Sequence, residues 1–414
     1  MNFLSRMIVM LKRIWRFGYS KAHAIFSQIT PEPVKNIKIK IISWRERKMV
    51  VQNQEVLRNI LQEKQIGNGY RTIIVFPPSL DWNVQLFQRP QQMALALAKQ
   101  GALVFYIQPK PDHKKQPFQL VRKRLYLCHV HVDTFQILSN PLIYLLTWNS
   151  RYASQFIHPR ILYDYVDDIN AFFGDHQKHV KGHQYLLQKA NYILATARKL
   201  VDEVYLLRPD VIFSPNGVEY EQFARAARKE FSSAPSDMQA ILSKSNPVIG
   251  YYGALARWFD YDLLKRVATL RPDYQFVLIG PDYDGTVKLS GILNIKNIYW
   301  LGVKPYEELP QYLQYFDVAT IPFIVNDITH ATSPLKLFEY MAGEKPIVIT
   351  PMKESMQYSG VLIGENSEQF AQKLDLALKM RENGTYLNLL RQTALENTWV
   401  RRAEEILSVI ETNH

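Results

Sequence analysis

Residues 326–346 read NDITHATSPLKLFEYMAGEKP and lie between two short apolar runs, one ending at Phe323 and one beginning at Ile347. A helix is predicted to start here at Ser333 or Pro334, because serine is a favourable N-cap and proline is tolerated at the first helical position. The free N–H groups of a helix start, together with the helix dipole, favour a bound anion. A strand, such a helix and a second strand are typical of a parallel α/β domain.

Two charged side chains of the predicted helix narrow the choice of anion. Lys336 lies in the first turn, where a cation is unfavourable to the dipole unless an anion offsets it, and a diphosphate would do so. Glu339 lies on the same face by the i, i+3 relation, and a carboxylate there can accept both hydroxyls of a ribose. The pair therefore predicts a nucleotide diphosphate site. The alternative is a surface ion pair contributing about 0.3 to 0.5 kcal/mol.

The rest of the chain alternates short apolar runs with helix-like stretches, in two successive series. This alternation predicts an α/β protein with two doubly wound domains, each built on a parallel sheet, whose loops meet at a shared cleft. Strands are predicted at 72–76, 103–107, 142–146, 161–166, 192–195 and 211–213, then at 248–252, 276–279, 298–301, 318–323, 347–349 and 361–363. Helices are predicted in the second series at 261–270, 309–315, 334–342 and 368–380, with a last helical stretch at 385–411.

The domain boundaries follow from these series. They are a basic N-terminal extension at 1–66, a first Rossmann-like domain at 67–235, a second Rossmann-like domain at 246–384, and a C-terminal helix at 385–414 that packs back across the domains. A length of 414 residues agrees with two domains.

Most of the formal net charge of +12 lies in residues 1–50, which hold eleven Lys or Arg residues against Glu32 and Glu46. Residues 1–19 have apolar side chains at helical spacing with basic ones mostly opposite, and no apolar run is long enough to span a bilayer. This predicts peripheral contact with a membrane surface and no nucleic-acid partner. Packing of this segment on its own domain and a cleaved organellar presequence are the alternatives.

Cys128 is the only cysteine, which excludes an internal disulfide and a multi-cysteine metal site. A reducing compartment follows, and with the basic extension the prediction is a cytoplasmic protein at the inner face of the cell membrane. Neither the dinucleotide fingerprint nor the P-loop pattern occurs, which argues against oxidoreductases and P-loop ATPases.

The stretch SPLKLFEYMAGEKPIV (333–348) resembles the donor motif of GT-B glycosyltransferases that build bacterial exopolysaccharides, capsules and teichuronic-type polymers, a group that includes relatives of the xanthan glucuronosyltransferase. Four further blocks match this resemblance in order: DWNVQLFQRPQQMALALAKQG (81–101), ILYDYVDDINAFFG (161–174), SPNGVEYEQF (214–223) and IGYYGALARWFDYDLL (249–264).

The resemblance implies a GT-B fold, with two Rossmann-like domains facing across a cleft. It implies that the N-terminal domain (67–235) binds the acceptor and that the C-terminal domain (246–384) binds the nucleotide sugar. It implies that Glu339 binds the ribose and that Ser333 and Lys336 hold the diphosphate, joined by backbone N–H groups around Gly253 and Ala254. The full donor-side prediction comprises Gly253, Ala254, Arg257, Ser333, Pro334, Lys336 and Glu339. No cofactor and no metal are expected, and Arg257 has the alternative interpretation of a surface loop charge.

One departure concerns the stereochemical outcome. Many retaining members carry a second glutamate eight residues before the motif glutamate, where this chain has Ala331, and Asp327 is too far upstream to be its obvious substitute. An inverting enzyme needs a general base in the acceptor domain. By resemblance Asp167 is favoured as this base, with Asp168 next, and crowding among acidic residues raises their pKa. The alternative is that Asp167 and Asp168 cap the following helix.

The acceptor side also includes Asp164 and Arg89. Asp164 is grouped with Asp167 and Asp168 in an acidic cluster at the C-terminal end of the predicted strand at 161–166, where it is expected to face the cleft, and Arg89 opens a helix. Arg89 is predicted to steady a lipid diphosphate or an acidic sugar, with helix capping or an interdomain salt bridge as the alternatives. His176, His179 and His183 are interpreted as cleft-edge or solvent histidines, because no cysteine or HExxH pattern accompanies them.

The predicted function is transfer of a sugar from a nucleotide diphosphate donor, most simply a uridine diphosphate sugar, to a hydroxyl of a lipid-linked or polysaccharide acceptor in cell-surface glycan synthesis. A non-catalytic nucleotide-sugar-binding or scaffolding subunit at the membrane is one alternative. Another is a metal-dependent GT-A transferase, because Asp-x-Asp occurs twice. Of these matches, Asp260 is expected to cap the helix at 261–270, and Asp284-Gly285 is expected to form a turn.

Overall fold

The computed structural model describes residues 32–62, 69–112, 114–172 and 174–412. Residues 1–62 and 63–414 form two compact units, and each is considered by itself. The first unit contains α3 (Glu32–Gln62), a helix of 31 residues. The amphipathic segment at 1–19 and its predicted membrane contact lie outside the described residues. Within the described residues, no helix is long and apolar enough to cross a membrane.

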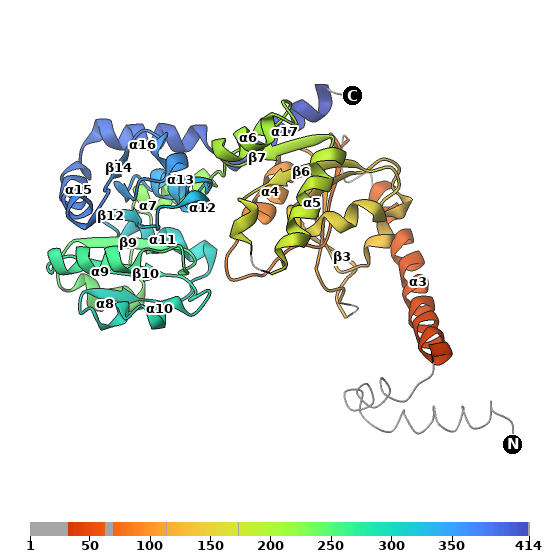
Figure 1. Cartoon of the computed structure of the whole chain (residues 1–414), viewed down its shortest axis with the longest axis horizontal. Coiled ribbons are helices and arrows are strands. Elements are labelled where there is room, and N and C mark those ends of the chain that lie inside the picture. Colours follow the sequence, from red (N-terminus) through yellow and green to blue (C-terminus); the bar gives the residue numbers. More distant parts are fainter. Residues whose placement is uncertain (1–31, 63–68, 113, 173, 413–414) are drawn as a thin grey trace, which may run out of the picture. The chain divides into compact units, whose positions relative to one another are not determined.

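The second unit contains two α/β domains, drawn from orange to green and from green to blue in Figure 1. The sheet of the N-terminal domain has eight strands in the order β3-β4-β2-β1-β5-β6-β7-β8, all parallel except β3. Its strands are β1 (Ile73–Phe76), β2 (Leu103–Ile107), β3 (Phe118–Arg122), β4 (Leu125–Cys128), β5 (Leu142–Leu145), β6 (Arg160–Tyr165), β7 (Tyr192–Ala195) and β8 (Ile212–Phe213).

The C-terminal domain has a six-stranded, fully parallel sheet in the order β11-β10-β9-β12-β13-β14. Counted in chain order this is 3-2-1-4-5-6, the doubly wound order whose ligands bind between the first and fourth strands. Its strands are β9 (Val248–Tyr252), β10 (Gln275–Ile279), β11 (Ile298–Trp300), β12 (Val318–Ile321), β13 (Ile347–Ile349) and β14 (Val361–Ile363). The central strands are buried throughout, because helices cover both faces of a doubly wound sheet.

The helices of the second unit are α4 (Arg89–Lys99), α5 (His176–Lys189), α6 (Arg198–Tyr205), α7 (Tyr220–Ala227), α8 (Ser236–Leu242), α9 (Tyr261–Leu270), α10 (Thr286–Leu289), α11 (Leu309–Gln314), α12 (Asp327–His330), α13 (Leu335–Ala342), α14 (Lys353–Met356), α15 (Ser367–Met380), α16 (Gly384–Glu396) and α17 (Trp399–Thr412). Each predicted strand is present within two residues at either end. The four predicted helices of the second series are present within one.

Two predictions require correction. The C-terminal stretch at 385–411 is not one helix, because α16 ends at Glu396 and α17 begins at Trp399. The sequence pattern also gave no strand between residues 107 and 142, where the structure has the antiparallel β3–β4 hairpin. Most of β3 is exposed, so it lacks the continuous apolar run by which buried strands were identified. β4, in contrast, is a buried apolar run of four residues and was missed although it has this pattern.

The last helix, α17, contacts α4 of the N-terminal domain. Trp399, Ala403 and Ile406 are part of the apolar cluster that includes Met93 and Leu97 of α4. On the outer side, Arg71 forms ion pairs with Glu404 and Glu411 of α17. The chain thus returns from the C-terminal domain and completes the core of the N-terminal one.

Candidate active site

A cavity of about 800 Å³ is lined by residues of both α/β domains. On the C-terminal domain it borders the ends of β9 and β12, the point where the strand order reverses and where doubly wound sheets bind ligands. All of the predicted donor-side residues line it: Gly253, Ala254, Arg257, Ser333, Pro334, Lys336 and Glu339. Arg89 and Asp167 line it from the N-terminal domain, whereas Asp164 and Asp168 do not.

The helix at the donor motif starts one residue later than predicted. Pro334 is the N-cap of α13, and the first helical residue is Leu335. Ser333 does not cap this helix, because its Oγ accepts a hydrogen bond from the backbone N–H of Asn216 at 3.2 Å. The Ser333 carbonyl also accepts from Asn216 Nδ2, at 2.6 Å. Ser333 is therefore tied to the segment that follows β8, and Asn216, in a quoted block of the sequence, gains a role that was not predicted.

Lys336 lies in the first turn of α13 and borders the cavity. Its Nζ lies 5.2 Å from the ring centroids of both Tyr251 and Phe323, and burial lowers its pKa to about 8. The lysine also passes close to Gly253, where a Cβ atom would lie 2.5 Å from Lys336 Cε. Because Gly253 has a φ of +137°, only glycine fits this position without strain. The ammonium group is thus held beside the end of β9.

Glu339, one turn further along α13, is 3% exposed. Tyr306 donates its hydroxyl to Glu339 Oε1 at 3.0 Å, and burial raises the pKa of this carboxyl group to about 7. The Tyr306 ring stacks on Phe87 of the N-terminal domain, with 5.5 Å between centroids. No sequence signal pointed to Tyr306, because it lies 33 residues before its partner in a separate connection.

Asp167 borders the cavity just after β6. Burial raises the pKa of its carboxyl group to about 7, and the neighbouring charges of Asp164 and Asp168 act in the same direction, against the opposing charge of Arg89. A carboxylate with a pKa near 7 is suited to general base catalysis at neutral pH.

Asp168 has a different environment from Asp167. Its Oδ1 accepts from the backbone N–H of Asn170 at 2.9 Å and so caps the short 3₁₀ turn Ile169–Ala171. Its Oδ2 pairs with Lys199 Nζ at 3.4 Å. For Asp168 the structure therefore has the helix-capping arrangement that was the alternative interpretation.

Asp164 lies within β6, not beyond its end, and it is fully buried. Its two carboxylate oxygens accept from Arg89 Nε and Nη2 at 2.7 and 3.0 Å. Arg89 also donates to the Ser214 hydroxyl, the Pro215 carbonyl and Asn216 Oδ1, so all five of its N–H groups have protein acceptors. The expectation that Asp164 faces the cleft is wrong, because its position inside a strand directs it into this buried network.

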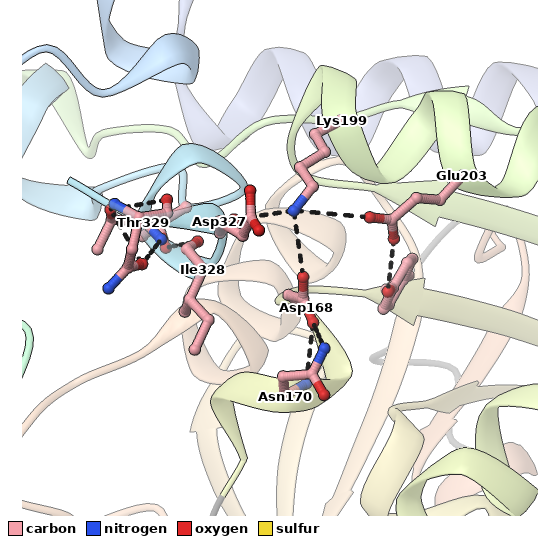
Figure 2. A network of polar contacts seen from close by, with 10 residues as sticks. Asp168, Asn170, Lys199, Glu203, Asp327, Ile328 and Thr329 are labelled. Atoms are coloured by element: carbon pink, nitrogen blue, oxygen red, sulfur yellow. Dashed lines mark hydrogen bonds and ion pairs between the residues drawn. The ribbon is translucent and has the colours of Figure 1, made fainter.

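Lys199 of α6 joins the two domains, as Figure 2 shows. Its Nζ donates to the backbone carbonyl of Asp327 at 2.9 Å and also contacts Asp168 and Glu203. Asp327 is the first residue of α12, and Ala331, at the end of this helix, is fully buried.

The two Asp-x-Asp matches take part in local structure. Asp260 Oδ1 accepts from the Leu263 N–H at 2.8 Å and caps α9, as expected. Asp282 Oδ1 accepts from the Val287 N–H at 3.1 Å, and Asp284 Oδ2 accepts from the Arg257 N–H at 2.9 Å. Among the residues that the structure describes, no group of three His, Cys, Asp or Glu side chains has an arrangement suited to a metal ion.

Comparison with known proteins shows similarity over parts of the chain. Residues 246–380, almost the whole C-terminal domain, match the family described as glycosyl transferases group 1. The putative teichuronic acid biosynthesis glycosyltransferase TuaH of Bacillus subtilis strain 168 is 30% identical over 224 residues, which cover 52% of this chain and 55% of that protein. The match thus spans about half the length of the curated relative.

Solved structures match over most of the chain. Sucrose-phosphate synthase from Thermosynechococcus elongatus has a TM-score of 0.62 at 15% identity, covering 82% of this chain and 98% of that one. A glycosyltransferase from Rickettsia africae has a TM-score of 0.59 at 15% identity, covering 84% of this chain and 100% of that one. HepE of Anabaena, in complex with UDP and glucose, has a TM-score of 0.55 at 13% identity, covering 82% of this chain and 99% of that one. The fold is GT-B, which confirms the predicted fold class.

Proposed function

We propose that this protein is a glycosyltransferase that moves a sugar from a nucleotide diphosphate donor to a hydroxyl group of a glycan acceptor. The observation that carries the proposal is one cavity bordered by both domains, with Asp167 from the N-terminal domain and Lys336 and Glu339 from the C-terminal domain. A cavity of about 800 Å³ lies within the range of about 300 to 1,000 Å³ that is usual for small-molecule sites.

The donor half combines the groups that a nucleotide diphosphate requires. Lys336 and the N-terminus of α13 supply positive charge for the diphosphate, and Glu339 supplies an acceptor for the ribose hydroxyls. Gly253 leaves room for the lysine, and the exposed Arg257 lies at the rim as a further cation. Uridine diphosphate is proposed as the nucleotide carrier, in accordance with the family resemblance of the motif.

The proposed reaction uses one carboxylate and one cationic helix start. Asp167 accepts the proton of the acceptor hydroxyl as the oxygen attacks the anomeric carbon, and the bond from that carbon to the diphosphate oxygen breaks. The leaving diphosphate gains negative charge, which Lys336 and the N–H groups of α13 stabilise. No metal ion takes part in the proposed scheme.

The acceptor is proposed to belong to cell-surface polysaccharide synthesis. The support is the match to a protein that is named for teichuronic acid biosynthesis. A cytoplasmic position at the membrane surface is proposed on the basic composition of residues 1–50.

The first test measures the thermal stability of the wild type and of Lys336→Ala with uridine, guanosine and thymidine diphosphates, each with and without chelator. A nucleotide at roughly 100 times its dissociation constant adds about 2.7 kcal/mol of stability. We expect stabilisation by uridine diphosphate that is insensitive to chelator and lost in the variant. Lys345→Ala is the matched control, because burial also lowers the pKa of Lys345 to about 8, yet Lys345 does not line the cavity.

The outcomes separate the alternatives. Stabilisation that requires a divalent metal would replace this scheme by a metal-dependent transfer, and no stabilisation by any nucleotide would remove the donor site. A protein that binds the nucleotide but neither hydrolyses nor transfers any of a panel of uridine diphosphate sugars would be a binding subunit instead.

A further inference from the structure

The two halves of the cavity differ in charge. The C-terminal half is bordered by Arg257, Lys304 and Lys336. In the N-terminal half, Arg89 is the one Lys or Arg among the described lining residues, and its five N–H groups are all bound to protein acceptors. The carboxylate of this half is Asp167. Among the lining residues that the structure describes in this half, a second anion would meet a carboxylate and no available guanidinium or ammonium group.

The same half has an aromatic wall. Trp148 and Phe172 meet edge to face, with centroids 5.3 Å apart and an interplanar angle of 73°. The ring centroid of His179 lies 5.3 Å from that of Phe172. The Trp148 indole N–H donates to the Ser79 hydroxyl at 3.0 Å, which fixes the orientation of the ring. Phe87, half-buried, borders the cavity near the Tyr306 ring of the other domain.

This combination selects a class of ligand. A buried charge without a counter-charge is costly, so an apolar wall beside an acidic group disfavours phosphate and carboxylate. A neutral pyranose, in contrast, has one face of C–H groups that packs on an aromatic ring and hydroxyls that hydrogen-bond at its edge. The half-cavity is therefore matched to an uncharged sugar ring.

We propose that the part of the cavity bordered by Trp148, Phe172 and Asp167 is a subsite for an uncharged sugar of the acceptor, which stacks on Trp148 and presents a hydroxyl to Asp167. Any diphosphate or uronic acid of the acceptor lies outside this subsite. This inference rests on the proposed function and names its acceptor class. It replaces the expectation that Arg89 holds a lipid diphosphate or an acidic sugar.

The proposal also places the reaction in a sequence. If the reacting sugar is neutral and remote from the lipid diphosphate, an earlier glycosyl transfer must have added that neutral sugar to the carrier. For a lipid-linked acceptor, the substrate is then a glycosylated lipid and not the bare lipid phosphate.

The test measures binding of matched pairs of methyl glycosides, each pair a neutral hexoside and its uronic acid counterpart, to the full chain saturated with uridine diphosphate. The pairs cover the gluco, galacto and manno configurations, and binding is followed by ligand-observed NMR. We expect at least one neutral hexoside to bind about tenfold more tightly than its uronic acid. Equal or tighter binding of the uronic acids would overturn the proposal.

Three variants assign the effect to residues. Trp148→Ala should weaken binding of the neutral hexoside about fivefold to tenfold. Trp148→Phe keeps an aromatic face and should retain most of the wild-type affinity. Asp167→Asn should strengthen binding of the uronic acid relative to binding of its neutral partner, because the substitution removes the negative charge that faces the ligand. Affinity for uridine diphosphate should be equal in all three. If Trp148→Ala leaves hexoside binding unchanged while uridine diphosphate still binds, the subsite is wrong and the donor site stands.

Discussion

Arg89 and Asp164 form a bidentate ion pair in the interior of the N-terminal domain, with N···O distances of 2.7 and 3.0 Å. The hydroxyl of Tyr144 donates to the same carboxylate. From this pair the guanidinium reaches Asn216, which in turn binds Ser333 at the start of the donor motif. The ion pair thus connects β6 to the donor loop through the segment that joins the two domains.

Arg89→Ala should destabilise the protein by about 3 to 5 kcal/mol, because it leaves the buried Asp164 carboxylate without a counter-charge. Urea unfolding of the purified chain measures this change. Arg391→Ala is the control, since Arg391 pairs with Glu344 at the surface and its loss should cost no more than about 1 kcal/mol. Similar destabilisation by both variants would mean that the buried ion pair contributes no more to the free energy of unfolding than the surface pair.

Asp167→Asn should reduce the rate of sugar transfer by about 10² to 10⁴-fold while affinity for uridine diphosphate is retained. In the wild type the base is active when deprotonated, so kcat/KM should rise with pH and level off above about 7, the pKa of this group. The amide variant should lose this dependence. A variant with full activity would exclude Asp167 as the base.

Stability should depend on pH through three carboxyl groups, Asp167, Glu339 and Glu354, whose pKa values burial raises to about 7. Because the folded state holds these protons more tightly than the unfolded chain, their contribution is fully present below about pH 4 and is lost as pH rises through 7. Urea unfolding at pH 5, 6, 7 and 8 should show this loss. Replacing the three by Asn, Gln and Gln should flatten the profile, and an unchanged slope would contradict the assignment.

Glu339→Gln should weaken binding of uridine diphosphate more than binding of 2′-deoxyuridine diphosphate, because the carboxylate is proposed to accept hydrogen bonds from the ribose hydroxyls. Hydrogen bonds to charged groups contribute about 1.5 to 3 kcal/mol, so a loss of roughly tenfold to hundredfold is expected for the ribonucleotide. Calorimetric titration of each nucleotide into the wild type and into Glu339→Gln measures the four affinities that this comparison needs. Equal losses for the two nucleotides would place the ribose elsewhere.

Lys199→Met should increase hydrogen exchange in α12, since this lysine donates from the N-terminal domain to the Asp327 carbonyl. Mass spectrometry of peptides covering 324–332 follows the change, and peptides from β9 serve as an internal reference. Lys189→Met is the matched substitution, because Lys189 is an exposed lysine in the last turn of α5 in the same domain. Unaltered exchange in α12 would show that the bridge does not restrain this segment.

The sequence predicted most of the regular structure because buried parallel strands are continuous apolar runs, as in β2 and β9. It missed the β3–β4 hairpin, in which β3 is an edge strand with exposed residues and β4 is a short buried run. It also placed the start of α13 one residue early. Helix ends are set by backbone partners, and the partner of Ser333 is Asn216, 117 residues away in sequence.

The site residues that could be predicted are those whose positions relative to one another are set by a single helix. Lys336 and Glu339 belong to one helix, so spacing alone places them on one side. Asp164 and Arg89 were different, because their roles depend on each other across 75 residues. Tyr306 and Trp148 gave no signal either, since single aromatic residues in connections have many possible uses and only the folded chain selects one.

The packing of α17 against α4 has a consequence for the order in which the protein can mature on the ribosome. N-terminal domains generally fold as they emerge, ahead of the domains that follow. Here, however, the first domain receives Trp399, Ile406 and Leu407 into its apolar cluster, and these residues are translated after every strand of the second domain. The domain made first therefore closes its core last, and an interrupted chain leaves an apolar face of α4 open to chaperones and proteases.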